Sequence, residues 1–484
     1  MSFNLHKTNA KQLHAYPLQE LDKLFPTKGK QAADQIRWRS GQFEKVNVTT
    51  IHHPHLVEDL FSGRDVKLDL NPWGDPAGFS TKSLNLRPFS QRVRPSTLAL
   101  EAIQKHQPSE FYERWLPWTE GIIKKLYLAA QEEAVALGKR TALNLYQTLR
   151  PASLMLVGRT LCVDFKGDML TQIETALEGL DSTYAKLAYV GSRSKFSWLP
   201  GSDVKSANQF LKDLEATIRP KVREQIGGGE QQDDLLTRWV HTKGQDGRSL
   251  KEDQVINEVV SFLIMSYTSL PKILFGAITN ITKQLQPDFF MALRKETNDV
   301  VKIITNIPAL GDETPPPVTP HNEAGWKTLP LHNAVVLEAL RLYPPNWLAQ
   351  YEVTQGTLPL GGAYDKDEKG PTINSNDQVW VSPWGFHHNP DYFKQPERFW
   401  PQRWAGNLEA ELPMHMFAPF GFNGKPALSE IYCKEIATRF LMVWFARYSA
   451  VDVPEKISWE LSLCLRPTTS VSWLHKRDLA RHTS

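Results

Sequence analysis

Residues 334–342 form an apolar segment that carries two opposite charges, Glu338 and Arg341. Their spacing of three residues places both side chains on one face of a helix. A surface helix keeps more polar positions than this segment has, so the pattern favours a buried helix over an exposed surface pair. Buried charges must be paired and further hydrogen bonded, because their desolvation otherwise outweighs their attraction. The segment therefore predicts a buried ion pair with additional polar partners.

The composition indicates a globular protein with a substantial core. Of the 484 residues, 41% are hydrophobic and 23% are charged, which excludes a disordered chain. The 56 basic and 53 acidic side chains leave a formal net charge of +3. Nucleic-acid binding requires a concentrated basic surface. Nucleic acid is therefore not an expected partner.

The cysteines and the apolar runs indicate the compartment. Cys162, Cys433 and Cys464 are odd in number and widely spaced, which is typical of a reducing compartment rather than of a disulfide framework. The first 24 residues contain no signal-peptide pattern, and no apolar run reaches the roughly 18 residues of a membrane-spanning helix. We therefore expect a cytoplasmic protein without a transmembrane anchor.

The order of the sequence patterns predicts a largely helical chain. Alternating apolar residues between 35 and 61 predict a strand, a turn and a second strand, followed by a helix. Helical spacing dominates from 108 to 285, and short strands follow between 351 and 381. A last long helix is expected from about 428 to 448.

Alternation at residues 461–465 and again at 471–473 predicts a closing hairpin. The chain shows no internal repeat. The expected fold class is therefore mainly α with small β-sheets (α+β). We expect an N-terminal extension over residues 1–34 and a single domain over residues 35–484.

Several motifs resemble, in their order and spacing, those of the cytochrome P-450 superfamily. Glu338-Ala-Leu-Arg341, followed by Leu-Tyr-Pro-Pro, looks like the Glu-x-x-Arg helix of that family. Residues 386–404 resemble its meander, and the whole match spans roughly residues 35–475. The resemblance implies the cytochrome P-450 fold.

The meander also contains two arginines that could complete a structural triad with Glu338 and Arg341. Arg398 lies in a Pro-Glu-Arg-Phe string, but the better register of the resemblance assigns this role to Arg403. In this family the triad holds the fold together and performs no chemistry.

The loop that carries the family's haem ligand departs from its pattern. The family motif is Phe-x-x-Gly-x-Arg-x-Cys-x-Gly, and its cysteine thiolate binds the haem iron. Without a gap, the motif aligns with residues 420–429, where Ala427 replaces the cysteine and Lys425 replaces an arginine that anchors a haem propionate. Tyr351 stands where the resemblance implies a second such arginine. The resemblance thus implies haem, but the expected ligand is absent, and no other metal is expected.

An insertion of six residues would make Cys433 the haem ligand instead. Apolar spacing from Leu428 to Trp444 continues the family's helix from the ungapped start. In that register Cys433 is a core residue about one and a half turns inside the helix. A free cysteine on an apolar helix usually serves as a small hydrophobic residue. The ungapped alignment is therefore favoured, and Cys433 remains the alternative ligand.

The oxygen-activating helix of the family usually carries an acid followed by an alcohol. The best match, residues 265–271, has Thr268 at the position of the acid and keeps an alcohol at Ser269. Proton delivery to dioxygen would therefore lack its carboxylate. The hydroxyls of Tyr267, Thr268 and Ser269 are the candidate catalytic groups, and Pro271 is expected to kink this helix.

Three functional hypotheses follow from the resemblance. The first is a protein of specialised metabolism that binds a small lipophilic molecule and catalyses a redox-neutral cyclisation, isomerisation or dehydration. The second is a catalytically silent accessory protein that activates a partner biosynthetic enzyme. The third is a haem monooxygenase with Cys433 or an unusual ligand. Because a fold does not fix a function, the residues of the site must decide between them.

Overall fold

The computed structural model describes residues 33–40, 44–62, 67–70, 119, 121–128, 132, 144–161, 165–190, 202–228, 235–241, 248–304, 329–360, 372–406, 408–422, 428–451, 453–461 and 465–475. The described helices are α3 (His55–Ser62), α8 (Leu145–Thr160), α9 (Gly167–Val190), α10 (Ser202–Ile226), α11 (Leu235–His241), α12 (Glu252–Gln284), α13 (Pro287–Ile304), α15 (Pro330–Leu342), α16 (Pro383–His387), α17 (Leu408–Glu411) and α18 (Leu428–Arg447). The strands are β1 (Ala33–Ser40), β2 (Glu44–Ile51), β3 (Lys67–Leu70), β4 (Ala349–Gln355), β5 (Leu358–Pro359), β6 (Thr372–Ile373), β7 (Gln378–Val381), β8 (Tyr448–Val451), β9 (Trp459–Leu461), β10 (Leu465–Pro467) and β11 (Ser472–His475). The predicted mainly α class with small sheets is confirmed.

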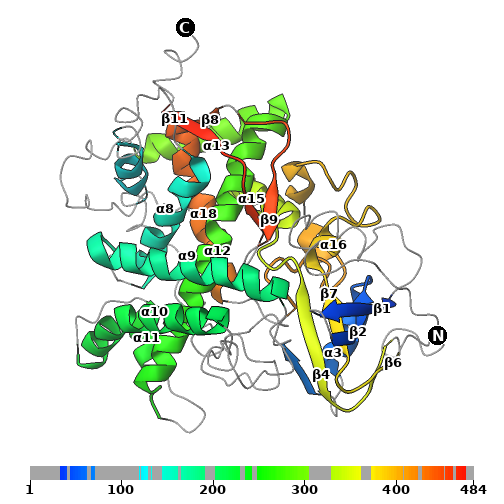
Figure 1. Cartoon of the computed structure of the whole chain (residues 1–484). Coiled ribbons are helices and arrows are strands. Elements are labelled where there is room, and N and C mark those ends of the chain that lie inside the picture. Colours follow the sequence, from blue (N-terminus) through cyan, green and yellow to red (C-terminus); the bar gives the residue numbers. More distant parts are fainter. Residues whose placement is uncertain are drawn as a thin grey trace.

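Helix α12 runs through the middle of the helical layer and contacts α8, α10, α15 and α18 (Figure 1). Its 33 residues span about 50 Å. Glu252 and Asp253 lie in its first turn, where negative charge favours the helix dipole. The Gln254 side chain accepts a hydrogen bond of 2.9 Å from the backbone N–H of Lys251. These contacts fix where the helix begins, and burial stabilises the rest.

Most of α12 is buried. Between residues 258 and 281 every residue is buried except Met265 and Thr268, which are partly exposed. By length and composition, Glu252–Lys283 is the one helix of the described residues that could cross a membrane, but 89% of its most apolar stretch is buried inside the protein. This helix is an exception to the expectation that no segment is sufficiently long and apolar. Burial in the core explains its composition.

A five-stranded sheet lies at one side of the helical layer, with the strand order β1-β2-β7-β4-β3 (Figure 1). Strands β2 and β7 are parallel, and the other neighbours are antiparallel. The strands and the helix predicted between residues 35 and 61 are confirmed as β1, β2 and α3. An apolar cluster packs α3 and α16 against this sheet and includes Ile51, Val57, Val353, Val381 and Phe386.

The strand pairing at the end of the chain differs from the prediction. We expected residues 461–465 and 471–473 to pair with each other, but β9 pairs with β10, and β11 pairs with β8. The Trp473 ring in β11 packs against Trp444 and Tyr448, with ring centroids 4.6 and 5.2 Å away. Alternation identifies a strand but not its partner, and here aromatic packing against the end of α18 decides the pairing.

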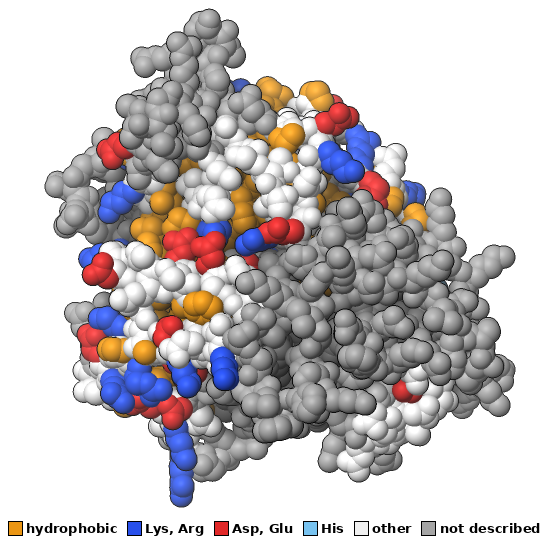
Figure 2. Space-filling view, in the orientation of Figure 1, with side chains coloured by type: hydrophobic (Ala, Val, Ile, Leu, Met, Phe, Trp, Pro, Cys, Tyr) orange, Lys and Arg blue, Asp and Glu red, His pale blue; other side chains and the backbone are white. Residues whose placement is uncertain are grey.

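Charges of both signs are mixed on the described surface over α9 and α10 (Figure 2). Ion pairs connect these helices to their neighbours. The Arg219 side chain on α10 lies 2.5 Å from Glu252 and 2.9 Å from Asp253, at the start of α12. Such half-exposed pairs stabilise a fold by at most about 1 kcal/mol each. They orient α10 on α12 rather than hold the core.

Candidate functional site

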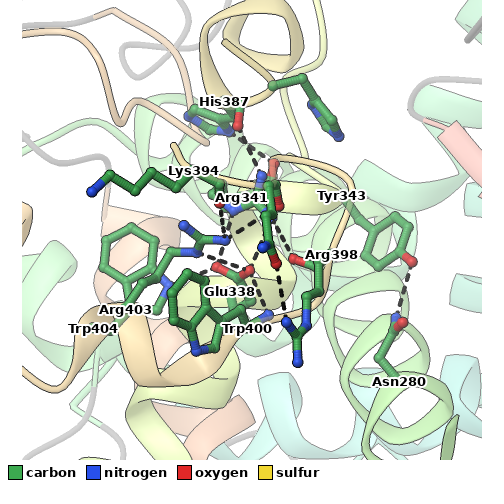
Figure 3. A network of polar contacts seen from close by, with 12 residues as sticks. Asn280, Glu338, Arg341, Tyr343, His387, Lys394, Arg398, Trp400, Arg403 and Trp404 are labelled. Carbon is green, nitrogen blue, oxygen red and sulfur yellow. Dashed lines mark hydrogen bonds and ion pairs between the residues drawn. The ribbon is translucent and has the colours of Figure 1, made fainter. Parts of the chain in front are cut away.

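The buried ion pair predicted from the sequence lies at the centre of a polar network (Figure 3). Glu338 and Arg341 come from successive turns of α15, and both side chains are fully buried. The Arg341 Nε and Nη2 atoms donate to the two carboxylate oxygens of Glu338 at 3.0 and 2.9 Å. The remaining Arg341 N–H groups donate to the carbonyls of His387 at 2.9 Å and Arg398 at 3.1 Å. The guanidinium therefore joins α15 to two parts of the meander.

Residues of the meander donate further hydrogen bonds to the Glu338 carboxylate (Figure 3). Its oxygens accept hydrogen bonds from the Trp400 backbone N–H and the Trp404 indole, both at 2.8 Å, and from Arg403 Nε at 3.2 Å. The Arg398 side chain instead donates to the Gln395 side chain at 3.0 Å. Only the backbone carbonyl of Arg398 belongs to the network. The structure thus places Arg403, and not the guanidinium of Arg398, against Glu338.

Burial affects the charges in this network. It lowers the pKa of Arg403, although the Glu338 carboxylate opposes that shift. A buried ion pair persists only where its desolvation is offset by good geometry and extra hydrogen bonds, and every polar atom of the Glu338 carboxylate has such partners. The arrangement is a structural anchor, with no open position for a ligand.

His387 links this anchor to the segment before the aligned haem loop. The Ala418 backbone N–H donates to His387 Nε2 at 3.2 Å, so Nδ1 carries the proton and donates to the Arg341 carbonyl at 3.1 Å. Burial lowers the pKa of His387 well below its usual range, and the charge on Arg341 lowers it further. Burial also lowers the pKa of His388 to about 3. Both imidazoles are therefore neutral structural groups.

The aligned haem loop is described only at its edges. Phe420 and Phe422 are buried, and α18 begins at Leu428, as the ungapped register predicts. Lys425 and Ala427 lie outside the described residues, so the loop geometry at the expected ligand position is not part of the structure.

Cys433 lies inside α18, five residues after Leu428 and fully buried. Its thiol lies against the Ser266 hydroxyl of α12. Burial raises the pKa of Cys433 to about 12, and the Ser266 hydroxyl only partly opposes that shift. The sulfur is packed between α18 and α12, more than one turn inside α18, whereas the family's haem ligand precedes this helix. Cys162 and Cys464 lie outside the described residues.

The three candidate catalytic hydroxyls lie on α12 but point in different directions. Successive residues of a helix are rotated by about 100°, so Tyr267 and Ser269 lie on nearly opposite faces. The Thr268 hydroxyl donates to the Ile264 carbonyl at 2.9 Å. Ser269 is fully buried, and its hydroxyl has no hydrogen-bond partner among the described residues. The structure therefore does not bring the three groups together, and Ser269 alone retains an available hydroxyl.

Tyr267 belongs to a polar cluster that sequence reasoning missed. Arg150 on α8 donates to its phenol oxygen through Nε at 2.7 Å and also through Nη2. Arg150 Nη1 donates to Gln147 at 2.9 Å and Glu178 at 3.2 Å. Burial raises the pKa of Tyr267, so the phenol stays protonated. Arg150 lies 117 positions from Tyr267, and no local pattern connects them.

The structure also describes Pro271 and Tyr351, the residues expected to kink α12 and to replace a propionate arginine. Helix α12 continues through Pro271, the residue expected to kink it. Tyr351, at the position of the second propionate arginine, is buried on β4. Tyr351 provides no cation for a propionate.

A carboxylate–imidazole–hydroxyl chain joins α13 to α15. Glu296 contacts His332 Nδ1, and the Thr297 hydroxyl lies 3.2 Å from His332 Nε2. The Glu296 carboxylate also accepts the backbone N–H groups of Leu331 and His332 at 3.0 and 3.1 Å. The Thr297 hydroxyl donates to the Leu293 carbonyl at 2.9 Å. The chain caps the start of α15 and resembles a catalytic relay only in its residue types.

Comparison with known proteins adds a family and several relatives. The family model described as Cytochrome P450 matches residues 111–424. Cyclooctat-9-en-7-ol 5-monooxygenase of Streptomyces melanosporofaciens is 25% identical over 225 residues, which cover 45% of this chain and 42% of that protein. Pentalenene oxygenase of Streptomyces avermitilis is 22% identical over 272 residues, or 56% of this chain and 53% of that protein. Cyclooctatin synthase of Streptomyces melanosporofaciens is 24% identical over 255 residues, or 51% and 50%. The chain thus spans about half the length of these curated relatives.

Proposed function

The chain belongs to the cytochrome P450 family, and from this membership we propose that it acts on a small lipophilic molecule of specialised metabolism without oxygen activation by a thiolate-bound haem. The proposal joins two lines of support. Three of the relatives that the chain matches are Streptomyces proteins, named as a monooxygenase, an oxygenase and a synthase of specialised metabolites. The residues that would supply the thiolate in this chain do not fit that role.

The observation that carries the proposal is the position of Cys433. A haem-ligating cysteine must be deprotonated and must face the iron, and in this family it precedes the long helix rather than lying within it. Cys433 is a buried thiol inside α18, and the ungapped sequence has Ala427 at the ligand position. No step of the proposed reaction therefore passes through an iron centre.

A redox-neutral reaction requires fewer groups from the protein than oxygen activation does. A cyclisation, isomerisation or dehydration needs a cavity that orients the substrate and a group that donates or accepts a hydrogen bond at the reacting atom. Of the three candidate groups, Tyr267 and Thr268 are engaged by Arg150 and by the helix backbone. Ser269 is therefore the group that we assign to the substrate.

One finding favours the alternative of a haem monooxygenase. Two of the matched relatives are named as a monooxygenase and an oxygenase. If this chain shares that chemistry, its haem ligand is either Cys433, in an arrangement of α18 other than the one described above, or an unusual residue.

The test is the haem content of the purified protein and its absorption spectrum after reduction under carbon monoxide. The wild type, Ala427→Cys and Cys433→Ala would be compared after expression with a haem precursor. We expect the wild type and Cys433→Ala to lack a thiolate-haem spectrum, and Ala427→Cys to gain part of one. A stoichiometric thiolate-haem signal in the wild type that disappears in Cys433→Ala would contradict the proposal and restore the monooxygenase.

A further inference from the structure

The β9–β10 hairpin contacts three helices. Its two strands form a sheet of their own. Because an isolated two-stranded hairpin is at best marginally stable, this hairpin depends on its contacts with the rest of the protein. Strand β9 provides Trp459, whose ring stacks on Tyr343 at the end of α15, with centroids 4.8 Å apart, and meets the edge of Phe275 on α12 at 6.3 Å. Strand β10 provides Arg466, which reaches α9.

Arg466 is shared between two carboxylates. Its Nε contacts Glu460, the residue directly opposite on β9. Its Nη1 lies 3.5 Å from Asp181 Oδ2 on α9. Burial lowers the pKa of Arg466, but the two carboxylates outweigh this effect, so the pKa is raised overall. One guanidinium therefore has one partner inside the hairpin and one partner outside it.

The two carboxylates respond differently to a movement of the hairpin away from α9. Glu460 moves with Arg466, because the two residues are paired across the strands of the hairpin. Asp181 stays on α9. The charge of Arg466 therefore keeps a partner in either position, and the movement breaks only the contact of 3.5 Å. Half-exposed ion pairs of this kind contribute little to stability, and salt screens them.

We propose that the β9–β10 hairpin is a strap that Arg466 holds closed against α9, and that the strap opens when Arg466 leaves Asp181 and keeps Glu460 alone. Opening uncovers the part of α9 around Asp181 and exposes Leu465, which is buried and precedes Arg466 on β10. The burial of Leu465 keeps the open strap a minor state. This device does not depend on the function proposed above.

The experiment measures how fast N-ethylmaleimide labels the thiol introduced by Leu465→Cys in the full chain. The parent protein also carries Cys162→Ser and Cys464→Ser, and the buried Cys433 stays as a control for unfolding of the whole protein. A buried thiol reacts only when it becomes exposed, so the labelling rate at position 465 follows the population of the open strap. Asp181→Asn should raise this rate about two- to fivefold. Raising the salt from about 0.05 to about 0.5 M KCl should raise it in the parent but not in Asp181→Asn.

Glu460→Gln is the sharper test, because its effect should have the opposite sign. Asp181 then no longer shares Arg466, and opening leaves the guanidinium without either carboxylate, so the labelling rate should fall about two- to fivefold. Two ordinary structural ion pairs would both loosen the hairpin when broken. A faster or unchanged rate in Glu460→Gln, or an unchanged rate in Asp181→Asn, therefore contradicts the strap.

Labelling of Cys433 should stay the same in the parent and in both variants, because opening of the strap leaves α18 packed. If it rises in a variant, that variant has lost the fold as a whole, and the salt series on the parent decides instead. A labelling rate at position 465 that does not change with salt would then contradict the strap.

Discussion

The network around Glu338 and the serines Ser261 and Ser269 of α12 are both buried and polar, but their hydrogen bonding differs. The oxygens of Glu338 accept hydrogen bonds from α15 and from the meander, and Arg341 returns its remaining donors to backbone carbonyls. The Ser261 and Ser269 hydroxyls have no such partners among the described residues. The first region therefore maintains the fold, whereas the second contains hydroxyls that the described residues leave without a hydrogen-bond partner.

The largest effect should come from breaking the anchor. Glu338→Ala would leave Arg341 and Arg403 buried without their carboxylate, which costs about 3–5 kcal/mol of unfolding free energy. The measurement is urea denaturation followed by tryptophan fluorescence. Glu178→Ala, which removes a half-exposed carboxylate, is the control and should cost under about 1 kcal/mol. Equal losses in the two variants would show that the network does not stabilise the fold.

The two meander arginines give a sharper form of the same test. Arg403→Ala removes a buried donor from Glu338 and should cost about 2–3 kcal/mol. Arg398→Ala keeps the carbonyl that Arg341 uses and removes an exposed contact to Gln395 and a distant cation–π contact with the Trp400 ring, so its cost should stay within about 0.5–1 kcal/mol. The same denaturation series measures both, and the reverse order would reassign the third member of the triad.

The side of α12 that carries Tyr267 should behave as scaffold. Tyr267→Phe removes the phenol oxygen that accepts two Arg150 donors, and it should cost about 1–3 kcal/mol of unfolding free energy. Thermal unfolding of the variant and the wild type measures this loss. An unchanged unfolding temperature would show that the contact between α8 and α12 does not stabilise the fold.

The α13–α15 cap gives a dependence on pH. Hydrogen bonds from His332 and from two backbone N–H groups hold the pKa of Glu296 below 4.5 against the effect of burial, which raises it. A carboxylate with a lowered pKa in the folded state stabilises the protein above pH 4.5, and this stabilisation is lost as the pH falls through the folded value. At pH 7, Glu296→Gln should cost about 1 kcal/mol, as the loss of a helix cap does.

The measurement is a series of urea denaturations of the wild type and Glu296→Gln between pH 7 and pH 3. The difference between the two proteins should shrink as the pH falls below 4.5. A constant difference across this range would show that the Glu296 charge does not contribute.

The sequence predicts the Glu338 network better than the other polar groups, because the signals for the network are local. Opposite charges three residues apart in an apolar segment predict the buried ion pair of Glu338 and Arg341. Apolar spacing predicts the start of α18 at Leu428. The role of Arg150 depends on a partner 117 residues away, which no local pattern encodes. The pairing of β11 with β8 likewise depends on aromatic packing between distant segments.

The catalytic candidates show a different limit of sequence reasoning. Tyr267, Thr268 and Ser269 are candidates because their segment resembles the oxygen-activating helix of the family and each carries a hydroxyl. A helix turns adjacent residues away from one another, whereas Ser261, Ser269 and Lys272 share a face because of their spacing. That spacing is visible in the sequence. The burial of all three residues, and the missing partners of the two hydroxyls, required the structure.

The smallest predicted effect distinguishes, by its sign, a buried hydroxyl without a partner among the described residues from a buried hydroxyl that has one. Ser269→Ala removes a buried hydroxyl that has no partner among the described residues and adds a better helix former, so it should stabilise the free protein by about 0.5–1 kcal/mol. Ser153→Ala removes an equally buried hydroxyl that donates to the Leu149 carbonyl at 2.7 Å, and it should instead destabilise the protein by about 0.5–1 kcal/mol. Thermal unfolding without ligand measures both variants. A gain of stability in Ser269→Ala is expected of a residue kept for its substrate rather than for the fold. A loss of stability would mean that the Ser269 hydroxyl is satisfied within the protein, and the contrast between the two regions would then disappear.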